Sequence, residues 1–178
     1  GWVADRHIGQ QNAILYGGLV IMIGHFLLAF TNIETFYLGL IFVVLGTGLL
    51  KPNISAIVGG LYEKEKEKKE AGFTIFYMSI NIGSVLGFFI CGYLGESIGW
   101  HYGFGAAGIG MAFGLIQFIL TRKNLGEVGI KPSIELPKNK KKKEAILLYL
   151  LSFIFLAALL MGIFGFWTID PIPLANAL

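Results

Sequence analysis

In Gly46-Thr47-Gly48-Leu49-Leu50-Lys51-Pro52-Asn53-Ile54-Ser55, a lysine, a proline and an amide interrupt an apolar run that covers residues 36–58. That run is long enough to cross a bilayer as one helix. A lysine at the centre of such a helix costs roughly 2.5–3.5 kcal/mol, and residues of this kind usually face a bundle interior or an aqueous path. Pro52 removes a backbone donor, which weakens the turn beside the charge. The segment predicts a solute site around Lys51 and Asn53; the alternative is that Lys51 extends its ammonium to the nearer membrane surface.

The composition is that of a membrane protein built from helices. Of the 178 residues, 55% are hydrophobic and 14% are charged, and the mean hydropathy is +0.71. Soluble domains carry about 25% charged residues, so we expect an all-α membrane protein and exclude a soluble enzyme. Glycines let helix backbones approach closely in a bilayer, and the spacing of Gly83 with Gly87 and of Gly110 with Gly114 predicts packing surfaces.

Five apolar runs are each long enough to span a bilayer. They cover residues 13–30, 36–58, 73–94, 102–120 and 146–167. Residues 1–4 are typical of the end of a further helix, and Asp170-Pro171 is expected to end the fifth run before a hairpin turn. We therefore predict an amino-terminal bundle at 1–121, a cytoplasmic basic linker at 122–144, and an inserted linker helix with the start of a hairpin at 145–178.

The charges divide between the two sides of this bundle. Except for Lys51, all of the 14 lysines and arginines lie at Arg6, in residues 63–70 or in residues 122–144, which alternating turns place on one side. This asymmetry is the positive-inside pattern, so the basic side is predicted to be cytoplasmic. It accounts for Lys140–Lys143 without a nucleic-acid partner and leaves the binding of anionic lipid heads open.

No predicted span contains Asp or Glu. If the protein moves protons, the membrane carboxylates that carry them would lie outside this chain. The sequence also shows no catalytic triad, no phosphate loop and no metal-ligand spacing, so we expect neither catalytic residues nor a metal site.

Two other polar groups are candidates for function. Tyr77 and Asn81 lie four residues apart and share a helix face, at a depth similar to that of Lys51 and Asn53 on their own helix. A cation, amides and a phenol in one layer suit a zwitterion that has a carboxylate and an amine. Hydrogen bonds that hold neighbouring helices together are the alternative.

The second group is the polar turn that contains Asp5, Arg6 and Gly9. An acid and a base at a tight turn can pair and bond to helix ends, which would latch two helices that separate as a transporter rocks. An ordinary capped turn is the alternative.

Two long motifs occur in order along the chain: Ala4-Asp5-Arg6-His7-Ile8-Gly9-Gln10-Gln11-Asn12-Ala13-Ile14 and Phe73-x-x-Phe76-Tyr77-Met78-x-Ile80-Asn81-Ile82-Gly83-Ser84. They resemble the two signatures of the proton-dependent oligopeptide transporter family, and residues 46–53 resemble the family's fourth helix. The resemblance implies a partial major-facilitator fold: the amino-terminal six-helix half without helix one and most of helix two, plus one extra linker helix of the bacterial type.

This resemblance implies proton-coupled uptake of di- and tripeptides by alternating access, with the proton as coupling ion and no other cofactor. The lysine matching Lys51 would contribute to peptide carboxylate binding and to proton coupling, and the asparagine matching Asn81 would help to hold the peptide amino end. The turn at residues 5–9 resembles the superfamily's gating motif, which usually carries basic residues where this chain has Gln, Gln and Asn at 10–12.

We expect a fragment that does not transport alone, because the family's glutamate- and arginine-bearing first helix and its second half lie outside the chain. The implied location is a bacterial cytoplasmic membrane, with basic loops inside. The implied partners are a small peptide, the lipid bilayer and the carboxy-terminal half of the same transporter. Transport of another solute, such as a drug or nitrate, and a non-transporting membrane remnant are the alternatives.

Overall fold

The computed structural model describes residues 1–63, 65–134 and 137–163, and the regular elements in these ranges are helices. In chain order they are the π-helical turn η1 (Ala4–Ile8), α1 (Gln10–Leu28), α2 (Ile33–Leu61), α3 (Lys66–Ser97), α4 (Trp100–Thr121), the 3-10 turn η2 (Arg122–Leu125) and α5 (Lys138–Ile163). The chain divides into two compact units, Gly1–Glu135 and Leu136–Leu178, which we describe separately. The predicted all-α architecture is confirmed.

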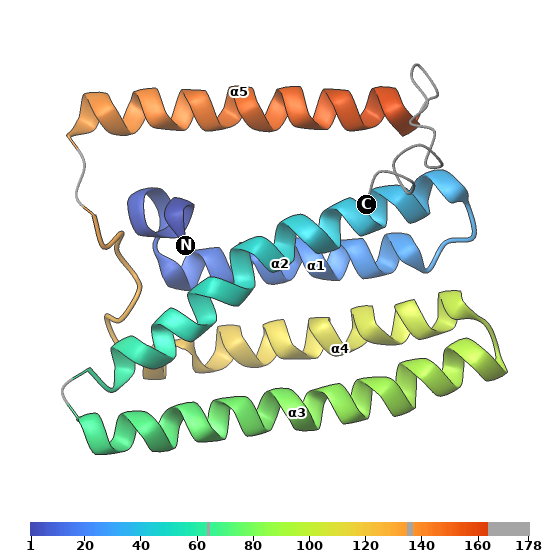
Figure 1. Cartoon of the computed structure of the whole chain (residues 1–178), viewed down its shortest axis with the longest axis horizontal. Coiled ribbons are helices and arrows are strands. Elements are labelled where there is room, and N and C mark those ends of the chain that lie inside the picture. The colour runs from blue at the N-terminus through green and yellow to red at the C-terminus, as the bar shows by residue number, and fades with distance from the viewer. Residues whose placement is uncertain (64, 135–136, 164–178) are drawn as a thin grey trace, which may run out of the picture. The chain divides into compact units, whose positions relative to one another are not determined.

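The first unit is a bundle of four helices that run alternately in opposite directions. α1 and α3 begin, and α2 and α4 end, on the same side of the unit (Figure 1). We call this side the basic end, because it carries Arg6, Lys68, Lys69, Arg122 and Lys123. α1 lies at the centre of the bundle, where it packs against α2 and α4, and α4 in turn packs against α3.

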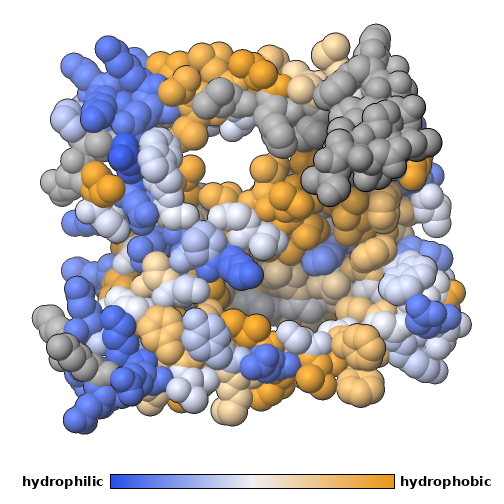
Figure 2. Space-filling model, in the orientation of Figure 1, coloured by the Kyte–Doolittle hydropathy of each residue, from blue (hydrophilic) through white to orange (hydrophobic). Residues whose placement is uncertain are grey.

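Large apolar side chains cover the outward faces of these four helices. Val44, Phe88 and Phe113 are among the most exposed, at 69%, 77% and 69%. Figure 2 shows hydrophobic residues along the helix middles and hydrophilic residues gathered at the basic end. Each of α1 to α4 is long and apolar enough to cross a membrane, and so much exposed apolar surface fits contact with lipid rather than water. The unit is a membrane-spanning bundle.

The contact between α1 and α2 is closed by glycines that recur at intervals of seven residues. A Cβ atom on Gly46 would lie 2.6 Å from the carbonyl oxygen of Gly17, and one on Gly39 would lie 2.8 Å from the carbonyl oxygen of Gly24. Seven residues make about two helical turns, so each pair of glycines occupies one stripe of its helix. The two backbones touch directly, as small residues permit in membrane helices.

The glycines that the sequence suggested as packing surfaces are different ones. They contact no neighbouring helix within the described residues, and their packing stays a prediction. A Cβ atom on Gly83, Gly87, Gly110 or Gly114 would meet nothing within 4 Å. A spacing of four arises often in a chain with this many glycines, so the spacing alone does not identify the face that touches a neighbour.

Two helices begin about two turns before their apolar runs. α3 starts at Lys66, and Lys68 forms an ion pair with Glu65 beside its first turn. α5 starts at Lys138, within the segment expected to be a linker. Lys and Glu are good helix formers, so a helix can continue into water beyond its apolar part. The fifth run is helical through Ile163; its remainder and the expected hairpin lie outside the described residues.

Candidate functional site

Lys51 and Asn53 lie on different sides of α2. The helix continues through Pro52; Lys51 is exposed in this chain, whereas Asn53 is only 1% exposed. Residues two apart on a helix point about 200° apart, which accounts for the difference. The Asn53 amide donates to the carbonyl oxygen of Leu49 at 2.5 Å, and its Oδ1 is buried without a hydrogen-bond partner among the described residues. The structure does not bring these two side chains to one surface.

Tyr77 and Asn81 share an exposed face of α3. Their spacing of four places them on one side of the helix; Tyr77 is 57% exposed, and Asn81 is also exposed. The Tyr77 ring stacks on Phe73 with centroids 6.2 Å apart and contacts Phe76 with centroids 5.5 Å apart. Aromatic pairs at such distances attract one another, so the phenol is supported from its own helix.

α2 and α3 meet near the basic end and diverge from there (Figure 1). A Cβ atom on Gly72 would lie 2.5 Å from the Tyr62 ring, and one on Gly59 would lie 3.8 Å from the Phe73 ring. Lys51 precedes the end of α2 by ten residues, a helical rise of about 15 Å. Lys51 therefore lies beyond the part of α2 that packs against α3. Within the described part of the chain, no helix covers the faces that carry Lys51 and Asn81.

The gating turn, residues Ala4–Gly9, holds the three residues predicted for it in one compact element. The Arg6 guanidinium lies over the Trp2 ring, 4.8 Å from its centroid, and the Asp5 backbone N–H donates to the carbonyl of Gly1 at 3.0 Å. Gly9 ends the turn with φ of 79°, and a Cβ atom there would lie 2.9 Å from the carbonyl oxygen of Gly129. Only glycine fits this combination of backbone angle and space.

A segment that the sequence left in the linker packs on this turn. Residues Gly126–Ile134, which we call the strap, follow η2 and return to the start of α1. There the side chain of Gln11, 1% exposed, donates to the carbonyl oxygen of Val128 at 2.8 Å. Sequence reasoning did not identify Gln11 as a functional residue. Its only signal was an amide where the gating motif usually carries a basic residue.

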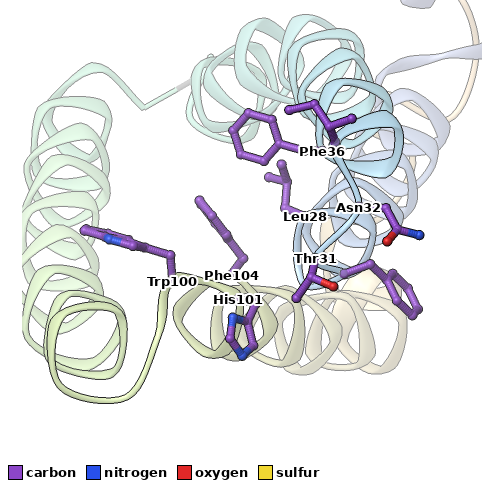
Figure 3. A pocket seen from close by; sticks show the side chains of 9 residues that line it. Leu28, Thr31, Asn32, Phe36, Trp100, His101 and Phe104 are labelled. Carbon is purple, nitrogen blue, oxygen red and sulfur yellow. The ribbon is translucent and has the colours of Figure 1, made fainter. Parts of the chain in front are cut away.

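A hollow of about 400 Å³ lies at the opposite end of the bundle, away from every predicted site residue. Leu28, Phe36 and Phe104 gather around it (Figure 3), and the Phe36 and Phe104 ring centroids are 6.4 Å apart. Its lining is mainly apolar, with His101 and Asn32 among the few polar residues. No acidic residue that could pair with the Lys51 ammonium is among the described residues that line it.

Comparisons with known proteins agree with the motifs. Residues 11–153 match the family model of PTR2, the POT family. The uncharacterized transporter YclF of Bacillus subtilis (strain 168) is 49% identical over 148 residues, which are 82% of this chain and 29% of YclF. A di-/tripeptide transporter of Lactococcus lactis subsp. cremoris is 38% identical over 178 residues, which are 99% of this chain and 34% of that protein.

The crystal structure of a peptide transporter POT in complex with sulfate superposes with a TM-score of 0.84 at 41% identity, covering 95% of this chain and 35% of that one. The chain thus spans about a third of the length of the proteins it matches. It forms part of a major-facilitator-type transporter fold, as predicted, and these relatives are transporters rather than enzymes. With a family match over most of its length, the chain belongs to the POT family, the proton-dependent oligopeptide transporters.

Proposed function

We propose that this chain serves in a secondary transporter that takes up di- and tripeptides together with protons by alternating access. The observation that carries the proposal is Lys51, a cation exposed on a bilayer-crossing helix. The name of the Lactococcus relative, a di-/tripeptide transporter that aligns with 99% of this chain, supports the substrate class. Since the chain spans about a third of such relatives, transport requires the remainder of the protein.

Lys51 is proposed to bind the carboxylate of the peptide. An isolated ammonium within lipid depth is costly. A peptide carboxylate that reaches Lys51 through a water-lined cavity would lower this cost, because the two groups form a strong charge-assisted hydrogen bond. Asn81 and Tyr77, exposed on the neighbouring α3, are proposed to hold the peptide's amino end and backbone. Asn53 is buried on the side of α2 away from Lys51, so its proposed part in the site is to hold the helix in place.

The proton is the proposed coupling ion. The middles of α1 to α4 contain no Asp or Glu, so the carboxylates that bind the proton are expected in the parts of the transporter outside this chain. Lys51 would couple to them through its charge, because a peptide carboxylate and an ionised acid compete for the same ammonium. Once the peptide pairs with Lys51, the acid loses its positive partner and binds a proton more readily.

The proposed setting is the cytoplasmic membrane of a bacterium, with the basic end of the bundle inside. The support is the charge distribution: basic residues flank α2, α3 and α4 at that end, and the turns at the opposite end contain no lysine or arginine. Such a bias sets orientation in multi-spanning proteins. The gating turn then faces the cytoplasm, where it can contact the rest of the transporter when the inner side closes.

The test uses the full-length transporter in liposomes with a labelled dipeptide. Lys51→Ala should reduce proton-driven accumulation at least tenfold while the protein still inserts, because the carboxylate loses its partner. Lys143→Ala removes an exposed lysine from α5 and should leave uptake unchanged. Undiminished accumulation in Lys51→Ala would remove the role assigned to Lys51.

Counterflow separates the rival functions. Exchange of labelled dipeptide supports peptide transport. Exchange of nitrate or a drug without dipeptide would assign another solute, and no exchange of any of them would identify a non-transporting remnant.

A further inference from the structure

The strap joins the gating turn to two helices at the basic end. Its last residue, Ile134, donates its backbone N–H to the carbonyl of Asp5 at 2.9 Å. Its middle accepts a hydrogen bond from the start of α1, because the backbone N–H of Gln11 lies 3.0 Å from the carbonyl oxygen of Gly129. On the α2 side, a Cβ atom on Gly60 would lie 3.0 Å from the Val128 side chain.

Gln11 is the buried polar centre of this contact. Its side-chain amide donates to Val128 O at 2.8 Å and, more weakly, to Gly126 O at 3.4 Å. Positive φ angles at Gly126 and Gly129, 59° and 73°, turn the strap so that its carbonyls face the amide. A buried polar group that loses its hydrogen-bond partner destabilises the folded protein, so Gln11 and the strap hold each other in place.

Resting on the transport function proposed above, we propose that Gln11 is a positioning residue that locks the strap across the gating turn. The strap is the segment through which the chain leaves α4 and continues to α5. A locked strap makes the gating turn, the start of α1 and this exit segment move as one body. Gln11 then acts on the conformational step of transport, because the gating turn must return to the same place in every cycle.

The same geometry predicts which kinetic parameter changes. Gln11 lies at the first turn of α1, whereas the proposed peptide-binding residues lie on α2 and α3, with Lys51 about 15 Å along α2 from its basic end. Loosening the strap should therefore lower the maximal rate of uptake and leave the apparent affinity for the peptide nearly unchanged.

The test replaces Gln11 by glutamate in the full-length transporter. Gln11→Glu keeps the length of the side chain but replaces an amide donor with a carboxylate that only accepts, directly opposite the strap carbonyls. Asn124→Asp, an exposed residue of η2, makes the same chemical change beside the strap. Hydrogen exchange measured by mass spectrometry on protein in lipid nanodiscs reports the strap, and dipeptide uptake in liposomes reports transport.

In the wild type, the Gln11 and Ile134 amides should be protected from exchange. Gln11→Glu should speed exchange in the strap at least tenfold and lower the maximal uptake rate at least fivefold, with KM within twofold of wild type. When the pH is lowered, strap exchange in Gln11→Glu should approach the wild-type rate measured at the same pH, because a protonated glutamate side chain can again donate a hydrogen bond. Asn124→Asp should change none of these quantities.

Unchanged strap exchange in Gln11→Glu would overturn the proposal. A loosened strap with an unchanged maximal rate, or a rise in KM instead, would do the same. If the wild-type protein takes up no peptide, the transport proposal fails, and the exchange data still decide whether Gln11 holds the strap.

Discussion

Replacing Gly46 with alanine should force α1 and α2 apart, and the same change two residues later should not. A Cβ atom on Gly46 would lie 2.6 Å from the carbonyl oxygen of Gly17 and 2.7 Å from the Ile21 side chain. A Cβ atom on Gly48 would meet nothing within 4 Å in this chain. The two positions lie on the same helix and receive the same methyl group, so they differ mainly in the space available.

The expected magnitude follows from two opposing effects. In a helix, alanine is favoured over glycine by roughly 0.5–1 kcal/mol, and both variants gain this. Overpacking a close contact costs about 1–3 kcal/mol, and only Gly46→Ala incurs it, because its new methyl faces backbone atoms that cannot turn aside. Gly48→Ala should thus be as stable as wild type or slightly more stable, and Gly46→Ala should be less stable than Gly48→Ala by about 1–3 kcal/mol.

Unfolding of the full-length protein in mixed micelles by increasing SDS, followed by far-UV circular dichroism, measures this difference. The midpoint should fall for Gly46→Ala and stay or rise for Gly48→Ala. Gly39→Ala should behave like Gly46→Ala, because its Cβ atom would lie 2.8 Å from the carbonyl oxygen of Gly24. Equal midpoints for Gly46→Ala and Gly48→Ala would refute the direct backbone contact between the two helices.

Two more substitutions test the basic end and the buried side of α2. Gly9→Ala forces a methyl group into a position with positive φ, where it would overlap the carbonyl oxygen of Ile130 in the strap. Strap exchange should rise and uptake should fall, and wild-type exchange rates would contradict the packing. Asn53→Leu removes a buried oxygen that lacks a partner, so stability should change by less than about 1.5 kcal/mol and the KM for dipeptide should stay within twofold. Asn53→Asp would bury a carboxylate and should destabilise the protein by several kcal/mol. A tenfold rise in KM for Asn53→Leu would instead place Asn53 in contact with the peptide.

The membrane-spanning part of the fold could be predicted because hydropathy and turn residues determine it locally. The run at 13–30 became α1 (Gln10–Leu28), and the run at 102–120 became α4 (Trp100–Thr121). The starts of α3 and α5 were predicted less well, because both helices begin in lysine-rich segments outside their apolar runs. Hydropathy marks where lipid surrounds a helix, and it does not mark where the backbone becomes helical.

The strap could not be predicted because its contacts join residues far apart in the sequence. Its backbone has no periodic pattern, and its hydrogen bonds connect residues 126–134 with residues 5–11. By contrast, the shared side of Tyr77 and Asn81 on α3 could be predicted, because residue spacing determines which side chains lie on one side of a helix. Spacing would also have separated Asn53 from Lys51, had the angle of about 200° between residues two apart been applied.

The two sides of α2 explain how one helix can be both packed and available for binding. Gly39, Gly46 and Asn53 recur every seven residues and are all buried, so they form one stripe against α1. Gly48 and Lys51 are three residues apart and share another side, and both are exposed. Because Pro52 has no N–H, the carbonyl of Gly48 lacks its usual helical donor, so this side offers an acceptor beside the Lys51 ammonium. Direct backbone contact along the buried stripe leaves little freedom between α1 and α2. In the proposed transport cycle, movement is therefore expected across the open side that carries Lys51 rather than between α1 and α2.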